Sequence, residues 1–305
     1  MGCMASPGHL DFYVCGAVAQ QLVAVGRRAV ATRELQIETI SLDLNLTQRR
    51  VDIDDRVHVD DQVISLEPLA TIGAESRKVL RAMAPSAGQP ISEWEPVAVF
   101  DEHFYQLVAT DEAPTLEIDG IQMHLTTNGR PFESASAFAE TVVRPGMRVL
   151  DTCGGLGYCA LHAVRCGADH VTSCEISSTV VQLRASNPWS PTDVENLTVE
   201  VGDVFRASTR LEPGSFDAVV HDPPRLALAP ELYSESFYLR LWDLLRPGGR
   251  LFHYTGDPGS RRSGSRLPGQ VRGRLRRIGF EVDMRPELQG MVAERGAKLS
   301  AGAHL

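Results

Sequence analysis

Cysteine is scarce in this sequence, and its spacing excludes several roles. Only six of the 305 residues are cysteines, and no two of them form a Cys-x-x-Cys pair. Four of the six lie between Cys153 and Cys174, in a stretch with the pattern of a strand, a loop and a helix. This distribution favours free thiols over a disulfide framework, and it indicates a reducing compartment.

Long apolar runs are also missing. The most apolar stretch near the N-terminus, residues 12–25, is interrupted by Gln20 and Gln21 and has no basic region before it. It is too short for a membrane span and lacks the form of a signal peptide. We therefore expect a cytoplasmic protein without a membrane segment. The chain also contains no internal repeat and no low-complexity tract.

Positive charge is depleted in the front part of the chain. Residues 1–130 contain 10 Lys and Arg against 19 Asp and Glu, whereas residues 131–305 contain 20 of each. The formal net charge of −9 thus arises entirely in the front part. An excess of acidic residues in the front part argues against general nucleic-acid binding there. It says little about residues 131–305, where the charges are balanced.

The first half of the chain has the pattern of a small β-rich domain. Residues 34–69 alternate as short strands separated by acidic turns, residues 73–83 have a helical pattern, and residues 85–96 have the composition of a linker. A strand pair over residues 97–108 and 116–124, with Asp119-Gly120 as its turn, completes the domain. We expect the following division: an uncertain N-terminal extension over 1–30, the small β-rich domain over 31–125, a larger domain over 126–296 and a tail over 297–305.

From Met147 onward the pattern becomes an alternation of strands and helices. The predicted strands are 147–151, 170–174, 197–201, 216–221, 250–255, 280–284 and 289–293. The predicted helices are 156–167, 176–186, 231–245 and 268–278. This alternation predicts an α/β fold with a mostly parallel, Rossmann-like sheet, whose ligands bind at the carboxyl ends of the strands.

A glycine-rich turn follows the first of these strands. Residues 151–158 read DTCGGLGY and lead into a predicted helix, which is typical of a loop that lets a nucleotide-type ligand approach the backbone. Glu175, at the end of the second strand, lies where an acid is expected to reach a ribose hydroxyl. By itself the loop does not separate a nicotinamide cofactor from S-adenosylmethionine, nor either of them from a tight turn without a ligand.

Three later features favour S-adenosylmethionine. Asp203 follows the third strand, at a position suited to accept a hydrogen bond from the adenine amine. Residues 221–225 (HDPPR) follow the fourth strand, where a hydride-transfer enzyme has no use for such a loop. Residues 245–250 (LRPGGR) form a tight turn before the fifth strand.

The ordered series resembles class I S-adenosylmethionine-dependent methyltransferases, and within them a family predicted mainly from archaeal genomes. The resemblance is carried by residues 114–124, 146–153, 187–190, 221–225 and 251–256. It implies a seven-stranded methyltransferase sheet whose last strand is antiparallel. It also implies three sets of contacts with S-adenosyl-L-methionine. Glu175 is expected to contact the ribose and Asp203 the adenine. The methionine end is expected to be contacted by Asp151, Gly154, Gly155 and Gly157. One departure is Gly154, where a bulkier residue is expected.

The Asp222-Pro223-Pro224 loop resembles the acceptor loop of methyltransferases that act on amino nitrogens. In those enzymes a side-chain oxygen and a prolyl carbonyl hold the amine so that its lone pair faces the methyl group, and catalysis is mainly positioning. We therefore expect Asp222 and Pro223 to be catalytic, with no metal required. The alternative is a stiff turn capped by Asp222. Arg225 replaces the aromatic residue of the motif, which removes the expected stacking plate for a flipped base. The two alternatives for the arginine are stacking by its guanidinium group and a clamp on phosphate or carboxylate. Tyr254 is a second candidate for lining the acceptor pocket.

Residues 261–277 contain seven arginines and no acidic residue, which is a composition suited to RNA. Arg261, Arg262 and Arg266 are the expected contacts, and a solvated loop and helix face is the alternative. The main functional hypothesis is methyl transfer to an amino nitrogen, with an RNA base as one candidate acceptor. Aminopropyl transfer, as in polyamine synthases, and a non-catalytic binding module are the two competing hypotheses.

Overall fold

The computed structural model describes residues 11–124, 126, 130–256 and 266–296. The chain divides into two compact units. Unit 1 comprises residues 1–131 with Ser186–Trp189, and unit 2 comprises residues 132–185 and 190–305. Within the described ranges, no helix is both long enough and apolar enough to cross a membrane. The stretch expected above to be an uncertain extension, residues 1–30, contains the first strand (Tyr13–Val14) and most of the first long helix (Gly16–Thr32) of unit 1.

The described residues of unit 1 form three small antiparallel sheets and two helices. The first sheet, ordered β1-β6-β7, consists of β1 (Tyr13–Val14), β6 (Leu80–Ala82) and β7 (Trp94–Pro96). The second follows chain order and consists of β2 (Gln36–Ile40), β3 (Arg49–Ile53), β4 (Arg56–Val59) and β5 (Gln62–Ser65). The third, ordered β11-β10-β9-β8, consists of β8 (Ala98–Asp101), β9 (His103–Val108), β10 (Thr115–Ile118) and β11 (Ile121–Gln122). The helices are α1 (Gly16–Thr32) and α2 (Leu66–Leu69).

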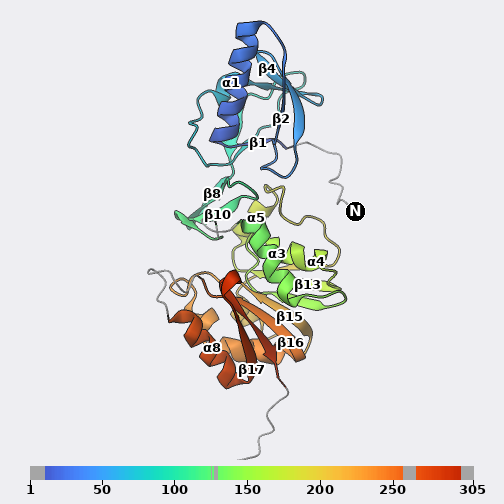
Figure 1. Cartoon of the computed structure of the whole chain (residues 1–305), viewed down its shortest axis with the longest axis vertical. Helices are drawn as coiled ribbons and strands as arrows, with labels where there is room; N and C mark the ends of the chain where they lie inside the picture. Colours follow the sequence, from blue (N-terminus) through green and yellow to red (C-terminus); the bar gives the residue numbers. More distant parts are fainter. Residues whose placement is uncertain (1–10, 125, 127–129, 257–265, 297–305) are drawn as a thin grey trace, which may run out of the picture. The chain divides into compact units, whose positions relative to one another are not determined.

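Helix α1 owes its position to one apolar stripe. Ala19, Leu22, Val23 and Ala29 recur at helical spacing, and all four are buried. They pack against β2, β3 and β4 in a core that also contains the inward-facing residues of those strands. Figure 1 shows α1 lying along the sheet that contains β2 and β4. The interruption at Gln20 and Gln21 falls on the other side of the helix, where Gln20 donates a hydrogen bond to the Ile72 carbonyl.

Two local predictions for unit 1 are wrong. Residues 73–83 form no helix; instead, Leu80–Ala82 pairs with β1 and β7, because the backbone there finds partners in distant strands. The Ser76 carbonyl accepts a hydrogen bond from the Gly16 amide at 2.8 Å, so its partner is a distant residue rather than one in a local helix. The expected linker over 85–96 contains β7.

The Asp119-Gly120 turn exists but joins different strands from those expected. Asp119 and Gly120 both have positive φ, at 48° and 80°, as a two-residue hairpin turn requires. The turn connects β10 to β11, both inside the stretch that was expected to be one strand. The predicted 97–108 strand is likewise divided, into β8 and β9.

Unit 2 alternates strands and helices as predicted. Its strands are β12 (Arg148–Asp151), β13 (His170–Glu175), β14 (Leu197–Val201), β15 (Phe216–His221), β16 (Leu245–Tyr254), β17 (Phe280–Arg285) and β18 (Gly290–Arg295). Its α-helices are α3 (Pro131–Val142), α4 (Tyr158–Arg165), α5 (Ser178–Arg184), α6 (Val204–Ala207), α7 (Glu235–Leu244) and α8 (Leu267–Ile278). Two 3₁₀ turns, Pro230–Tyr233 and Pro286–Leu288, complete it.

The seven strands form one sheet in the order β14-β13-β12-β15-β16-β18-β17. Strands β12 to β16 are parallel, and β18 is antiparallel to both of its neighbours. The expectation of a Rossmann-like methyltransferase sheet with an antiparallel last strand is confirmed. The central strands are fully buried at Leu150, Val219 and Leu251, as expected for a sheet covered on both faces. Figure 1 shows helices of unit 2 packed against this sheet.

Candidate active site

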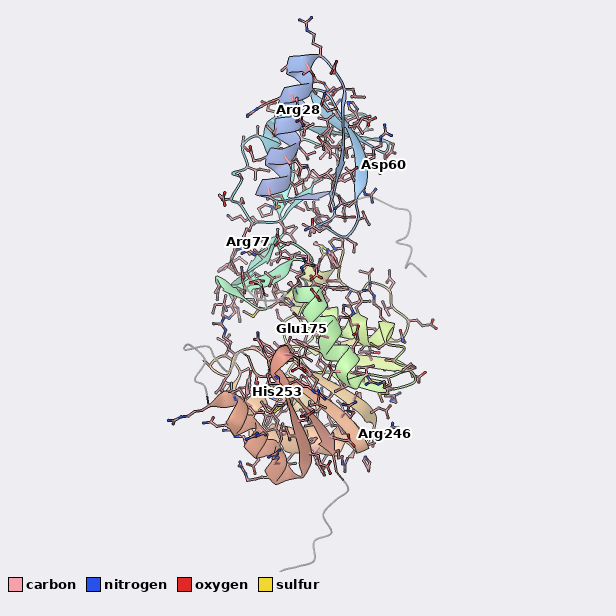
Figure 2. The ribbon with its side chains drawn as sticks, in the orientation of Figure 1. Arg28, Asp60, Arg77, Glu175, Arg246 and His253 are labelled. Carbon is pink, nitrogen blue, oxygen red and sulfur yellow. The ribbon has the colours of Figure 1, made fainter. Side chains whose placement is uncertain are left out.

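The parallel sheet brings the predicted site residues to one edge. Asp151 ends β12, Glu175 ends β13 and His221 ends β15, and these strands are neighbours in the sheet. The carboxyl ends of parallel strands meet at the same edge, which is where ligands bind in such folds. Figure 2 labels Glu175 and, near the end of β16, His253. The cofactor loop (residues 151–158) and the acceptor loop (residues 222–225) therefore leave adjacent strands.

The cofactor loop requires its three glycines for two different reasons. Gly155 and Gly157 have φ values of 47° and 85°, which residues with a side chain rarely adopt. Gly154 has an ordinary φ, but a side chain there would collide with Ser173 Oγ and would lie 2.5 Å from Arg184 Nη2. The departure from the family pattern at position 154 thus has a structural explanation, because Arg184 already fills the space that a bulkier residue would occupy.

Asp151 is buried beneath this loop and only partly hydrogen bonded. Ser173 Oγ donates to its Oδ2 at 2.8 Å, while Oδ1 is buried without a hydrogen-bond partner among the described residues. Burial raises the pKa of Asp151 to about 6, although the Ser173 hydrogen bond and the charge of Arg184 oppose the rise. A buried acceptor without a donor is a position that a ligand or a water molecule is expected to fill.

Glu175, the residue expected to bind a ribose, fixes the cofactor loop and has both of its carboxylate oxygens engaged. Its Oε2 accepts from the Gly155 amide at 2.7 Å, and its Oε1 accepts from the Ser177 amide at 2.9 Å. Ile176 beside it is 72% exposed, an unusual state for a large apolar side chain. Sequence reasoning missed Ile176, although an apolar residue directly after the strand-end acid was a usable signal.

Asp203 has a local role that accounts for part of its geometry. It is the N-cap of α6: its Oδ1 accepts from the Phe205 amide at 2.8 Å, and its Oδ2 lies 3.5 Å from Arg206 Nε. The preceding residue, Gly202, donates its amide hydrogen to the Glu175 carbonyl at 2.8 Å. The structure therefore places Asp203 beside the end of β13, with both carboxylate oxygens already engaged.

The acceptor loop presents a carboxylate without a partner. Asp222 is half-buried, and its carboxylate has no hydrogen bond within the described parts of the chain. Burial, and then the charge of Asp151, raise the pKa of Asp222 to about 7. Pro223 is buried and Pro224 is exposed. Tyr233 holds the loop in place by donating its hydroxyl hydrogen to the Pro224 carbonyl at 2.9 Å.

The two proposed acceptor-pocket residues differ in their surroundings. Arg225 is exposed, and its backbone carbonyl accepts from the Leu228 amide, which starts the turn after the loop. Tyr254 is half-buried, its hydroxyl donates to Gln289 Oε1 at 3.2 Å, and its ring packs against Phe138. The structure thus gives Tyr254 a packing role and leaves the Arg225 side chain facing solvent.

A buried histidine links the two loops, and sequence reasoning did not anticipate it. His221 Nε2 faces the Leu232 carbonyl at 3.1 Å, so this nitrogen carries the hydrogen and donates it. His221 Nδ1 then accepts from the Thr152 hydroxyl at 2.7 Å. Burial lowers the pKa of His221 to about 3, consistent with a neutral ring. Thr152 also donates its amide hydrogen to the Val220 carbonyl, which ties the start of the cofactor loop to the strand that carries the acceptor loop.

His253 lies beside His221 and is also neutral. Its Nδ1 donates to the Tyr254 carbonyl at 2.8 Å, and its Nε2 accepts from the Tyr238 hydroxyl at 2.9 Å. Burial, and then the neighbouring His221, hold the pKa of His253 well below its usual range. With both ring nitrogens engaged, His253 is a structural group rather than a proton acceptor for a substrate.

The segment Asn187–Ser190 is divided between the two units. Trp189 Nε1 donates to the Leu44 carbonyl at 2.8 Å within unit 1, so the tryptophan is a packing residue. Ser190 Oγ donates to the Leu156 carbonyl at 2.7 Å and so supports the cofactor loop of unit 2.

The arginine-rich segment is described only in part. Arg261 and Arg262 lie outside the described residues, and Arg266 is exposed just before α8. On α8, Arg277 pairs with Glu235 at 2.9 Å and Arg274 donates to the Tyr233 carbonyl. The basic composition of the segment is thus partly used within unit 2.

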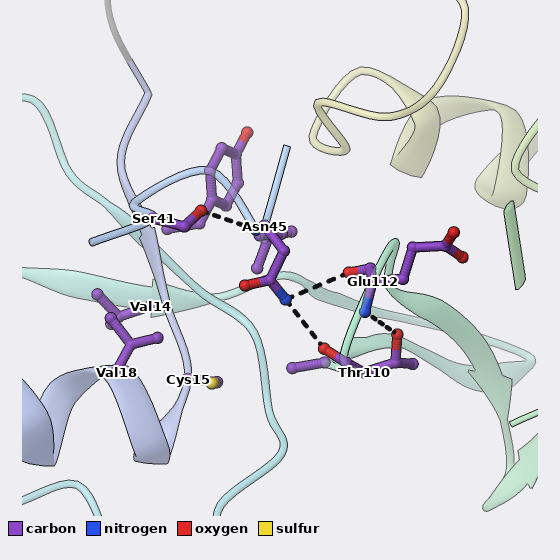
Figure 3. Close-up of a pocket in the computed structure, with 10 residues that line it drawn as sticks. Val14, Cys15, Val18, Ser41, Asn45, Thr110 and Glu112 are labelled. Atoms are coloured by element: carbon purple, nitrogen blue, oxygen red, sulfur yellow. Dashed lines mark hydrogen bonds between the residues drawn. The ribbon is translucent and has the colours of Figure 1, made fainter. Parts of the chain in front are cut away.

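Figure 3 shows a cavity in unit 1. It has a volume of about 20 Å³ and is lined by residues from β1, α1 and neighbouring loops. Asn45 closes one side by donating to the carbonyls of Thr110 and Glu112 at 3.1 and 3.4 Å. A cavity of this size holds about one water molecule, so it is too small for a substrate.

Comparison with known proteins places the chain in a family. No protein-family model matches it. Uncharacterized protein MJ1233 of Methanocaldococcus jannaschii is 37% identical over 262 residues, which span 83% of this chain and 88% of that protein. A solved spermidine synthase in complex with the transition state analogue AdoDATO is 17% identical, with a TM-score of 0.52 and coverage of 65% of this chain and 73% of that chain.

A weaker structural similarity is found to an S-adenosylmethionine-dependent methyltransferase from Mesorhizobium loti. It is 19% identical, with a TM-score of 0.38 over 52% of this chain and 96% of that chain. The strand order and the antiparallel β18 described above establish the fold independently of this similarity. The chain therefore belongs to the same family as the archaeal protein MJ1233, and its unit 2 has the Rossmann-like fold of class I methyltransferases.

Proposed function

We propose that this protein is an S-adenosylmethionine-dependent methyltransferase that acts on an amino nitrogen. The observation that carries the proposal is the pairing of two loops on the adjacent strands β12 and β15. One loop is built from glycines around a buried acid, and the other presents the carboxylate of Asp222, which has no hydrogen-bond partner in the described parts of the chain. A bound sulfonium cofactor supplies an activated methyl carbon, which leaves the protein the task of positioning a nucleophile.

The residues of the cofactor loop fit such a ligand. Gly155 has open space on the side where a side chain would project, so a ligand can approach its backbone. Asp151 offers a buried acceptor atom, Glu175 lies at the end of the neighbouring strand, and the exposed Ile176 offers an apolar surface suited to a base. Asp203 remains a candidate for the adenine amine, through a second lone pair on an oxygen that already caps α6.

Asp222 and Pro223 act on the acceptor in this proposal. The carboxylate of Asp222 accepts a hydrogen bond from the amine, the Pro223 carbonyl accepts a second, and the lone pair of nitrogen is thereby directed toward the methyl carbon. The N–C bond forms as the C–S bond breaks, with its electron pair going to sulfur. The excess proton on nitrogen passes to Asp222 or to water. Arg225 and Tyr254 are proposed to border the acceptor.

Aminopropyl transfer from decarboxylated S-adenosylmethionine is the second candidate. The solved spermidine synthase shares the fold, and a partnerless carboxylate serves an attacking amine equally well in both reactions. The acceptor-loop sequence Asp-Pro-Pro favours methyl transfer. A protein that binds neither cofactor would instead be a binding module.

Titration calorimetry with four ligands tests the proposal. We expect S-adenosylmethionine and S-adenosylhomocysteine to bind, decarboxylated S-adenosylmethionine to bind more weakly, and NAD not to bind. Tight NAD binding without S-adenosylmethionine binding would refute the proposal, and preference for the decarboxylated cofactor would favour aminopropyl transfer. Incubation of cell extract with methyl-labelled cofactor then identifies whether RNA, protein or small molecules acquire the label.

RNA is the acceptor class that we propose to examine first. Arg261, Arg262 and Arg266 lie in the segment richest in positive charge, directly after β16. Exposed Arg272 and Arg276 continue the positive charge along α8. Phosphate groups are the complement of such a surface.

A further inference from the structure

Arg184 is a buried cation beneath the cofactor loop. It is the last residue of α5 and is only 4% exposed. Its Nε donates to the Gly155 carbonyl at 2.8 Å. Its two terminal nitrogens, Nη1 and Nη2, are buried without hydrogen-bond partners among the described residues. Arginine is rarely buried to this extent without a pairing partner, so the position needs an explanation.

The shape of the loop is matched to this side chain. A Cβ on Gly154 would lie 2.5 Å from Arg184 Nη2, and a Cβ on Gly157 would lie 3.5 Å from Nη1. The guanidinium group therefore occupies the volume that a side chain at position 154 would fill, whereas at position 157 the closer obstacle is Pro191, which a Cβ would approach to 2.7 Å. Glycine at position 154 and arginine at position 184 are two halves of one packing arrangement.

The charge of Arg184 is also matched to its surroundings. The carboxylates of Asp151 and Glu175 are the groups whose charges favour the protonated guanidinium, against the opposing effect of its burial. Asp151 Oδ1 is the unpaired acceptor and Arg184 Nη1 and Nη2 are the unpaired donors of the same buried region. The cation thus balances two acids of the predicted cofactor site without closing a direct ion pair with either of them.

We propose that Arg184 is a positioning residue for the cofactor: it holds the cofactor loop by the Gly155 carbonyl, fills the space beneath Gly154 and balances the charges of Asp151 and Glu175. This inference rests on the proposed function. The strand-end motifs do not include α5, so the inference gives this helix a role in cofactor binding. Without the cation, the loop loses one hydrogen bond and its support from below, and two acids face each other in a buried region.

The test compares Arg184→Met, which keeps the length and apolar stem, with Arg184→Lys, which keeps the charge. Binding of S-adenosylhomocysteine is measured by calorimetry between pH 6 and pH 8. We expect Arg184→Met to lose roughly tenfold or more in affinity, because it removes a charged hydrogen bond to the loop. Arg184→Lys is expected to recover part of that affinity.

The pH dependence of binding separates positioning from simple structural support. Removal of the cation raises the pKa of Asp151 further, so Arg184→Met should bind best at a higher pH than the wild type, whereas Arg184→Lys should keep the wild-type profile. Six ionisable groups among the described residues interact electrostatically with Asp151 and so bear on this pH dependence. They are Cys153, Cys159, Cys174, Glu175, Arg184 and Asp222. None of these except Arg184 is altered in the comparison.

Gly154→Ala supplies a second route to the same result. It adds one methyl group against the guanidinium and against Ser173 Oγ and removes no functional group, so we expect it to weaken binding in the wild type. Only the part of its effect that comes from the guanidinium can depend on Arg184. Its effect should be smaller in the Arg184→Met background, and a double-mutant cycle measures this coupling. Arg295→Met is the matched control, because Arg295 donates to the backbone carbonyls of Asp243 and Leu245, away from the loop.

Thermal unfolding of each variant is recorded in parallel. Removing the cation alone leaves the buried carboxylates of Asp151 and Glu175 without a compensating charge, which is destabilising. We therefore expect Arg184→Met to unfold at a lower temperature than the wild type but to stay folded at the temperature of the calorimetry, where its loss of affinity is measured. The inference is overturned if wild type binds and Arg184→Met binds equally well, or if its affinity falls only in proportion to its stability. If wild-type protein binds neither S-adenosylmethionine nor its product, the proposed function fails instead.

Discussion

The two strand-end loops of unit 2 differ in how many of their polar groups are already engaged. The cofactor loop is held by Glu175, Arg184 and Ser190, each through a hydrogen bond to its backbone. The acceptor loop is held by another side chain at one point, where Tyr233 donates to the Pro224 carbonyl, and Asp222 has no hydrogen-bond partner among the described residues. Groups that are already hydrogen bonded fix the geometry of a loop. A half-buried carboxylate without a hydrogen bond costs stability, and groups of this kind are concentrated at functional sites.

The largest expected effect follows from removing that carboxylate. Asp222→Ala should lower methyl transfer roughly 10²-fold or more, because a misplaced nucleophile alone can cost that much. Cofactor affinity should stay close to the wild-type value, since no hydrogen bond connects Asp222 to the cofactor loop. Single-turnover transfer and calorimetry on the same preparation measure the two quantities. Full activity of the variant would exclude the amine-orienting role.

A pH profile sharpens the same contrast. The ionised carboxylate of Asp222 accepts a hydrogen bond from an amine more strongly than the neutral acid does, and it can also take up the released proton. Burial, and then the charge of Asp151, raise the pKa of Asp222 to about 7. We therefore expect kcat/KM to fall about tenfold per pH unit below pH 7. The profile of kcat should begin to fall at a lower pH, because a bound sulfonium cation favours the carboxylate. A pH-independent rate between pH 5.5 and pH 8 would contradict this assignment.

The same shift predicts an opposite effect on stability. A carboxyl group whose folded-state pKa is raised contributes stability that is complete below its unfolded pKa of 3.8 and is lost as the pH rises through about 7. Asp222→Asn should therefore stabilise the ligand-free protein at pH 8, by roughly 1–3 kcal/mol after allowance for partial solvent access. Little difference is expected at pH 4. Denaturant unfolding at both pH values makes the comparison.

Glu175 belongs to the engaged loop and should show the reverse pattern from Asp222. Glu175→Ala removes the acceptor for the Gly155 and Ser177 amides as well as the expected ribose contact. Loss of a hydrogen bond to a charged group corresponds to roughly 10- to 100-fold in cofactor affinity. Saturating cofactor should restore most of the turnover. If saturation restored none of it, Glu175 would have a role in the transfer step itself.

A smaller effect distinguishes two buried tyrosines. Tyr233→Phe and Tyr238→Phe each remove one buried hydroxyl, and each should cost about 1 kcal/mol of stability. Tyr233 holds the acceptor loop through the Pro224 carbonyl, whereas Tyr238 contacts His253. Turnover should therefore fall roughly three- to tenfold only in Tyr233→Phe, with unchanged cofactor affinity. Equal losses in both variants would show that the hydroxyl of Tyr233 acts only through stability.

The two units also differ in how much of their fold could be predicted from the sequence. In unit 2, apolar runs bounded by glycine and proline marked the strands, and their order followed because parallel strands place Asp151, Glu175 and His221 at one edge. In unit 1, residues 73–83 have a helical pattern, yet long-range backbone pairing with Phe12 and Leu107 overrides it. Local periodicity does not reveal such partners.

The same limit applies inside the candidate site. The glycines and acids could be identified from the sequence because each occupies a fixed place after a strand. Arg184 could not, because its role depends on how α5 packs beneath the loop. The Thr152–His221 hydrogen bond could not either, since it joins residues 69 positions apart. Residues that carry a motif were visible, and residues that hold the motif in place were not.

The smallest expected effect concerns the arginine-rich segment, and it depends on RNA being the acceptor. Neutralising Arg261, Arg262 and Arg266 should flatten the dependence of RNA affinity on salt by about two units of log–log slope, since each phosphate contact to a single strand contributes about −0.7. The control triple is Arg27, Arg28 and Arg33, which are exposed in or directly after α1 of the acidic unit 1. Binding of a fluorescent single-stranded RNA oligonucleotide at several salt concentrations measures the slope, and calorimetry confirms that cofactor affinity is unchanged. Equal slopes for both triples and the wild type would remove RNA from the candidate acceptors and leave a small amine or a protein, because a solvated loop makes no phosphate contact that salt can weaken.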